Sequence, residues 1–129
     1  MFCLYRWIVY SGEMIIFVVE SLFFSFPKCM NKVRITAIRQ TVYSDLMAMY
    51  ENPIEHTCDV FKGQTWISID GQCPEGMCPS AWESMRPFVE SLARGEGNFY
   101  DGWMKNPMSA MISCNDGFRP FSFYLEVID

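Results

Sequence analysis

The strongest structural signal in the chain is an amphipathic segment between Ser80 and Gly95. Its apolar residues recur at helical spacing, namely Ala81, Met85, Phe88, Val89 and Leu92. Ser80 and Glu83 form an S-x-x-E capping box at the start of this helix, and Gly95 is the residue type that ends helices. Pro87 removes one backbone hydrogen bond, so we expect it to kink or split the helix. One helix with a single apolar face must pack on a sheet supplied by the rest of the chain.

Strand patterns surround this helix. Alternating or β-branched residues predict four strands, over residues 32–43, 64–70, 109–114 and 118–127. The last two flank Asn115-Asp116-Gly117 and predict a C-terminal hairpin, with Pro120 placing the start of its second strand at an edge or bulge. Ser44 as N-cap predicts a short helix over 45–51, which Asn52-Pro53 ends. The sequence therefore predicts an α+β fold in one small domain, ordered β-α-β-α-β-β, with the helices packed on one sheet.

Composition divides the chain near Met30. Residues 1–29 contain two basic and two acidic residues, so the whole formal net charge of −5 belongs to residues 30–129. The apolar run from Met14 to Phe26 is interrupted by Glu20 and is shorter than the about 20 residues that a spanning helix needs. No small-x-small cleavage site follows it. We expect residues 1–29 to be an apolar extension from a mis-assigned start, with a weak signal or membrane anchor as the alternative, and residues 30–129 to form the α+β domain.

The acidic composition narrows the classes of partner. Lys32, Arg34 and Arg39 are spread along one predicted strand, whereas nucleic-acid binding needs clustered positive charge. No P-loop, G-x-G-x-x-G, G-x-S-x-G or H-E-x-x-H pattern occurs. We expect no nucleic-acid partner, no membrane contact except through residues 1–29, and either a homodimer or a protein partner. The expected location is the cytoplasm, or a membrane surface if residues 1–29 form an anchor.

Cysteines at predicted loops and element ends define the candidate site. Cys58 lies in the irregular loop 54–63, Cys73 and Cys78 bracket the turn before the long helix, and Cys114 opens the hairpin turn. His56, the only histidine, comes two residues before Cys58. Cys78 lies within one turn of the helix N-terminus, where free N–H groups and the helix dipole favour a thiolate. A domain of roughly 100 residues buries enough surface to fold without disulfides, so these cysteines are not needed to stabilise the fold by cross-linking.

Several chemistries remain open for these residues. Cys58, Cys78, Cys114 and His56 supply enough ligands for a tetrahedral zinc or an iron–sulfur site, although paired C-x2-4-C knuckles are absent. Cys73 and Cys78 could instead form a reversible disulfide across their turn. A nucleophilic Cys–His pair would have to use His56, and no orienting group for it is identifiable from the sequence. The simplest alternative is that each cysteine only fills space and the histidine has no role.

A second candidate region is the loop after the long helix. Its aromatic and methionine side chains could line an apolar ligand pocket or a protein contact, or simply belong to the core: Phe99, Tyr100, Trp103, Met104, Met108 and Met111. Turn chemistry fully explains Asp116. Arg119 is expected to pair with Glu126 or Asp116, or to face an acidic ligand.

The end of the chain carries the motif C-x-D-G-x-R-P-x-x-F, from Cys114 to Phe123. With weaker matches at 32–36, 45–46, 58–64 and 74–82, residues 30–129 resemble a family of small, uncharacterised prokaryotic proteins of about 100 residues. The resemblance implies a compact cytoplasmic domain and no particular activity. It places Cys58, Cys78 and Cys114 at motif positions, whereas Cys73 has no counterpart, which weakens the Cys73–Cys78 pair.

Together these observations predict a cysteine-centred site linked to metal binding or redox chemistry. The alternative is a non-catalytic module that binds a ligand or a protein through loop 99–111. The sequence does not decide whether the protein is an enzyme.

Overall fold

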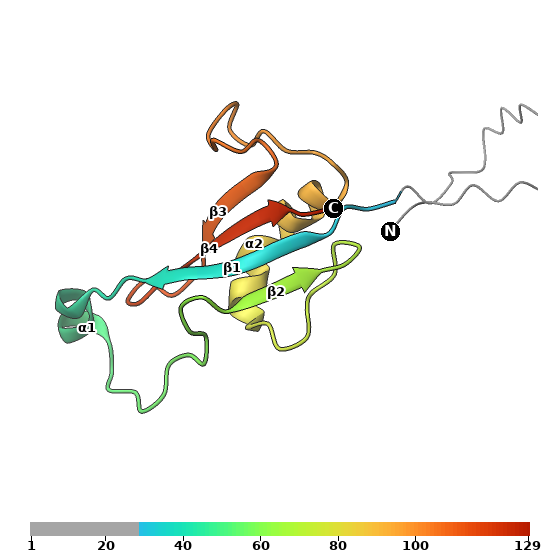
Figure 1. Cartoon of the computed structure of the whole chain (residues 1–129). Helices are drawn as coiled ribbons and strands as arrows, with labels where there is room; N and C mark the ends of the chain where they lie inside the picture. Colours follow the sequence, from blue (N-terminus) through green and yellow to red (C-terminus); the bar gives the residue numbers. More distant parts are fainter. Residues whose placement is uncertain (1–28) are drawn as a thin grey trace, which may run out of the picture.

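A computed structural model describes residues 29–129, and predictions that concern residues 1–28 lie outside this range. Six elements follow one another along the chain (Figure 1): β1 (Val33–Gln40), α1 (Ser44–Tyr50), β2 (Thr65–Ser68), α2 (Pro79–Ala93), β3 (Ser109–Ser113) and β4 (Phe121–Val127). This is the predicted order of strands and helices. The α+β class, in one small domain, is confirmed.

The four strands form one antiparallel sheet in the order β2-β1-β4-β3. Val33 of β1 lies opposite Ser68 of β2 on one side and Val127 of β4 on the other, and β3 pairs with β4 as the predicted C-terminal hairpin. A register shift interrupts the β1–β4 ladder between Ala37 and Arg39. Pro120 lies just before β4, in the connection from β3, because proline has no N–H to donate to a central strand.

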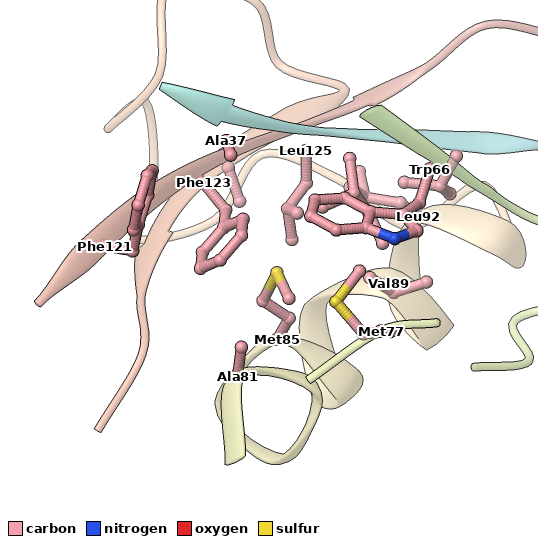
Figure 2. Packing of buried hydrophobic residues seen from close by; sticks show 13 residues of the cluster. Ala37, Trp66, Met77, Ala81, Met85, Val89, Leu92, Phe121, Phe123 and Leu125 are labelled. Carbon is pink, nitrogen blue, oxygen red and sulfur yellow. The ribbon is translucent and has the colours of Figure 1, made fainter. Parts of the chain in front are cut away.

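The core lies between α2 and one face of the sheet. Alternate residues of the two central strands point to this face because side chains alternate along a strand, and α2 adds its apolar stripe with its period of 3.6 residues. Figure 2 shows the side chains of the sheet and the helix meeting there. The largest fully buried apolar side chains of the cluster come from both layers: Val33, Ile35, Phe123 and Leu125 from the sheet, and Met85, Val89 and Leu92 from α2.

The sequence predicted the C-terminal end of α2 correctly and its N-terminal end incorrectly. The capping-box prediction is wrong: the helix begins at Pro79, Cys78 is its N-cap, and no side chain caps it. Proline is favoured at the first helical position because it has no N–H to leave unpaired. The C-terminus is as predicted, since Gly95 has a positive φ of 82° and its N–H donates to the Leu92 carbonyl at 3.0 Å. Pro87 lies inside α2 without splitting it.

The expected packing of helices on the sheet is provided by α2, which contacts β1, β3 and β4. In contrast, α1 buries none of its residues, and Figure 1 shows it beyond the end of β1, away from α2. Its N-cap is Tyr43 without a side-chain hydrogen bond, so Ser44 is the first helical residue and not the predicted cap. Packing on the core therefore does not hold α1, and another interaction must do so.

Replacing a core methionine should cost far more than replacing an exposed one. Met85 is fully buried and Met49 in α1 is 67 % exposed. We expect Met85→Ala to lower the free energy of unfolding by about 2–5 kcal/mol, because it leaves a cavity between helix and sheet. The matched variant Met49→Ala should change it by no more than about 0.5 kcal/mol. Urea denaturation of both variants measures this, and equal losses would contradict the assigned core.

Candidate functional site

A cavity of about 530 Å³ lies between loop 51–64, the N-terminus of α2 and the connection between β3 and β4. Its lining includes all four residues predicted as the site: His56, Cys58, Cys78 and Cys114. Cys73 is not among the lining residues. Three segments far apart in sequence thus place the motif cysteines and the only histidine around one cavity, whose apolar side includes Met77, Phe121 and Phe123.

Cys78 is held at the cavity by the residues on both sides of it. Gly76 has a φ of 77°, which an L side chain rarely adopts, and this lets the turn reverse so that the Met77 N–H donates to the Pro74 carbonyl at 3.3 Å. Met77 is buried in the core. After Cys78 the helix begins at once, and the Cys78 carbonyl accepts the Trp82 N–H at 2.9 Å. The half-buried Cys78 side chain also packs against the core cluster.

Cys114 is fixed by the end of the hairpin. Its N–H donates to the Phe121 carbonyl at 3.0 Å, and its Sγ accepts the Phe121 N–H at 3.3 Å. In the connection that follows, the Asp116 carboxylate accepts the N–H groups of Phe118 at 2.8 Å and Arg119 at 3.2 Å. This is the turn chemistry predicted for Asp116. The Cys114 sulfur therefore occupies a defined, half-buried position.

The third wall of the cavity, loop 51–64, is held much more loosely. Within the described part of the chain, no backbone-to-backbone hydrogen bond involves residues 52–60. Cys58 is exposed, and its Sγ accepts the Val60 N–H at 3.4 Å. Val60 packs against the core cluster and anchors this end of the segment. A segment with so few backbone bonds and apolar contacts opens at low cost in free energy.

His56 has a partner that the sequence-based reasoning missed. Its Nε2 lies 3.1 Å from Oδ1 of Asp59, and both side chains are largely exposed. Asp59 also lines the cavity. The signal was available, because the two residues are three positions apart. This carboxylate is a candidate for the orienting group of His56 that was not identified from the sequence.

The converging residues do not form a ready-made metal centre. Among residues 29–129, no three His, Cys, Asp or Glu side chains lie close enough together to hold one ion. Cys58, Cys73, Cys78 and Cys114 are free thiols. A tetrahedral zinc or an iron–sulfur cluster needs three or four protein ligands around one point. The metal set of Cys58, Cys78, Cys114 and His56 therefore stays a prediction that would require loop 51–64 to move.

Cys73 is a poor partner for Cys78. It is exposed and outside the cavity lining, and its thiol donates to the Pro74 carbonyl at 3.6 Å. Partial desolvation raises the pKa of the Cys73 thiol above its ordinary value. A raised thiol pKa lowers the thiolate fraction at neutral pH, and the thiolate is the form that attacks disulfides.

Arg119 occupies the cavity wall as part of a charge network. It is only 8 % exposed and binds the carboxylate of Glu51, with Asp116 3.5 Å away on its other side. The hydrogen bond to Glu51 is the main reason that the pKa of Arg119 is raised. Glu126, one of the partners considered from the sequence, binds Arg34 instead. Two carboxylates thus balance the positive charge of Arg119. Because Glu51 is 68 positions away in the sequence, no local pattern predicts that it pairs with Arg119.

The aromatic loop is divided between core and surface. Phe99 lies edge-on to Phe88 at 5.0 Å and packs against the core with Met108. Tyr100 and Trp103 contact each other edge-to-face at 5.3 Å and are 75 % and 44 % exposed. An interaction surface in loop 99–111 stays a prediction, now limited mainly to this aromatic pair.

No protein-family model, curated protein or solved structure matches this chain. The resemblance suggested by the C-x-D-G-x-R-P-x-x-F motif accordingly stays a prediction. Within residues 29–129, none of the helices combines the length and the apolar character needed to cross a bilayer.

The Glu51–Arg119 pair should hold α1 and the start of loop 51–64 in place. We expect Glu51→Gln to lower the melting temperature and to speed amide hydrogen exchange over residues 44–60, because a buried guanidinium loses a charged partner. The matched variant Glu55→Gln, at an exposed position of the same loop, should behave like the wild type. Unchanged exchange over residues 44–60 in Glu51→Gln would show that α1 is held by something else.

Proposed function

We propose that the protein works through a redox-linked thiol site, with Cys78 as the attacking thiol and Cys58 as its disulfide partner. The observation that carries this proposal is the convergence of three free cysteines, from three separate segments, on one cavity. Cysteines that only fill space are normally fully buried. Here Cys58 is exposed, and Cys78 and Cys114 are half-buried, so the thiols are accessible to a reactant.

Cys78 is the thiol best placed to act as the nucleophile. It is the N-cap of α2, which is 15 residues long, and no side-chain hydrogen bond caps this end. Pro79 has no N–H, so the backbone N–H groups of Ser80 and Ala81 are the donors left without partners in the first turn. These donors and the helix dipole stabilise negative charge at the N-cap position. A thiolate there is both a nucleophile and a good leaving group in disulfide exchange.

Cys58 is better suited than Cys114 to close a disulfide with Cys78. Forming a disulfide requires the two Cα atoms to lie about 4.4–6.8 Å apart, so at least one cysteine must be able to adjust. Cys58 lies in the segment 52–60, which makes no backbone-to-backbone hydrogen bonds within the described residues. The hydrogen bond to its sulfur comes from Val60, two residues further on in the same segment, so it can move with Cys58. The Cys114 sulfur, by contrast, accepts the Phe121 N–H, and this hydrogen bond would be lost if Cys114 moved.

The chemistry proceeds in two exchanges. The Cys78 thiolate attacks one sulfur of a substrate disulfide, and the S–S bond breaks to give a mixed disulfide and one substrate thiolate, which takes up a proton. The Cys58 thiolate then attacks the Cys78 sulfur, forming the Cys58–Cys78 disulfide and releasing the second substrate thiol. The substrate disulfide gains the two electrons that the protein dithiol loses. In this proposal His56, which is paired with Asp59 and lines the same cavity, accepts the proton of a cavity thiol.

The arrangement of the thiols around the cavity favours the redox alternative over the metal alternative. Disulfide exchange needs two thiols that can meet, whereas a zinc or iron–sulfur site needs three or four ligands together, and no such group exists among the described side chains. The cytoplasmic location expected from the sequence fits this choice, because disulfides in the cytosol are mostly transient and catalytic or redox-sensing.

Controlled oxidation tests the proposal. We expect the reduced full-length protein, equilibrated in redox buffers of increasing potential, to form one Cys58–Cys78 disulfide that peptide mapping identifies. Cys78→Ser should abolish this disulfide, while Cys73→Ser should leave it intact, since Cys73 is outside the cavity. Failure of Cys78 to pair at any potential would overturn the assignment.

Metal analysis of protein purified without oxygen separates the two alternatives. Stoichiometric zinc or iron that is lost in Cys78→Ser and kept in Cys73→Ser would favour the metal site. Metal-free protein in which Cys58, Cys73, Cys78 and Cys114 each react with a thiol reagent, as located by peptide mapping, is the result expected for a thiol redox site.

A further inference from the structure

The cavity has an excess of negative charge, which bears on the substrate that it accepts. Arg119 is the only Lys or Arg among the described residues that line it. Its guanidinium binds Glu51 and lies 3.5 Å from Asp116, so its positive charge is already neutralised within the protein. A carboxylate on a ligand would find no unpaired basic side chain in this wall.

Asp59 adds a second carboxylate to the lining, from a different segment than Asp116. It lines the cavity from loop 51–64, and its side chain is 93 % exposed beside His56. Among the lining residues, Asp59 and Asp116 outnumber Arg119, so the lining is negative when His56 is neutral. Glu51, which binds Arg119 from outside the lining, adds a further negative charge nearby. The chain as a whole is also acidic, with a formal net charge of −5. Fields of this kind raise the local concentration of ligands of opposite charge and repel ligands of like charge.

The shape and the apolar wall indicate a small molecule. The cavity volume of about 530 Å³ lies within the range of roughly 300–1,000 Å³ found for small-ligand sites. Met77, Phe121 and Phe123 give it an apolar side, against which short methylene arms of a ligand can pack. Cys58 and Cys78 belong to the same lining, so a disulfide bound in the cavity shares it with both thiols.

We propose that the substrates of this site are small organic disulfides that carry positive charge, such as those with aminoalkyl arms, and that the cavity discriminates against anionic disulfides. This proposal rests on the thiol–disulfide chemistry proposed above and adds the selection of substrate. The ammonium groups face the carboxylates of Asp59 and Asp116, the methylene arms contact the apolar wall, and the Cys78 thiolate attacks the central S–S bond. One substrate disulfide is reduced to two aminothiols as the Cys58–Cys78 disulfide forms.

Three disulfides that differ in charge test this selection. The reduced full-length protein is mixed with cystamine, bis(2-hydroxyethyl) disulfide or dithiodiglycolate, and the mixed disulfide at Cys78 is quantified by mass spectrometry over time. Each rate is divided by the rate of the same disulfide with free 2-mercaptoethanol, which removes differences in intrinsic reactivity. We expect the normalised rate to fall from the cationic to the neutral to the anionic compound, by about tenfold overall. The difference should shrink in 1 M salt, where the Debye length is about 3 Å.

Two matched variants assign the effect to the cavity. Asp59→Asn should reduce the ratio of the cationic to the anionic rate, because it removes one lining carboxylate. Asp70→Asn, at an exposed position outside the lining, should leave the ratio unchanged. The ratio is the informative quantity, because a loss of His56 orientation in Asp59→Asn would slow all three compounds alike.

The possible results separate this proposal from the one on which it rests. Equal normalised rates, or a faster anionic compound, would overturn the charge selection while leaving Cys78 as the reactive thiol. Absence of a mixed disulfide at Cys78 with all three compounds would overturn the thiol–disulfide function itself. A ratio that Asp59→Asn and Asp70→Asn lower equally would attribute the preference to net charge and overturn the role of the cavity.

Discussion

The packing of α2 on the inner face of β1 and β4 is the interaction on which the rest of the structure depends. Met85, on the helix, and Phe123, at the centre of the sheet, are fully buried within one cluster (Figure 2). Because helices and strands are rigid, this contact fixes the positions in space of the first residues of α2 and of β4. Cys78 is the N-cap of the first, and Cys114 is bonded to the backbone at the start of the second. The core therefore sets the positions of two of the three cavity thiols.

The cavity combines this rigid part with a loosely held one. Loop 51–64 carries Cys58 and His56 and is secured at one end by the Glu51–Arg119 ion pair, and towards the other by the packing of Val60. Between these anchors its backbone makes no backbone hydrogen bonds to the rest of the described chain. Disulfide exchange benefits from such an arrangement, since one thiol must stay activated while the other moves to meet it.

Several features of the fold and the site were predictable because they depend on neighbouring residues. The period of 3.6 residues around Met85 predicted α2, and Gly95 predicted its end. The position of Cys58, Cys78 and Cys114 at loops and element ends indicated where a site would lie. The N-terminus of α2 was misassigned by two residues, because the S-x-x-E pattern made Ser80 the N-cap whereas the structure has Cys78 there, followed by Pro79, which fits the first helical position better. The same local reasoning overlooked Asp59 beside His56.

The sequence by itself determined the class of fold, the order of its elements and the segments that hold reactive side chains, because these follow from periodicity, turn chemistry and capping over a few residues. Only the tertiary structure decided that the three thiols surround one cavity without grouping as metal ligands. It also decided that α1 buries no residue, while Glu51, just after it, binds Arg119. Such features join side chains as far apart as the 68 positions between Glu51 and Arg119. The packing of α2 on the sheet fixes the distances between these segments, and only then can their side chains make contact. The residues near each segment in the sequence give no signal of its distant partner.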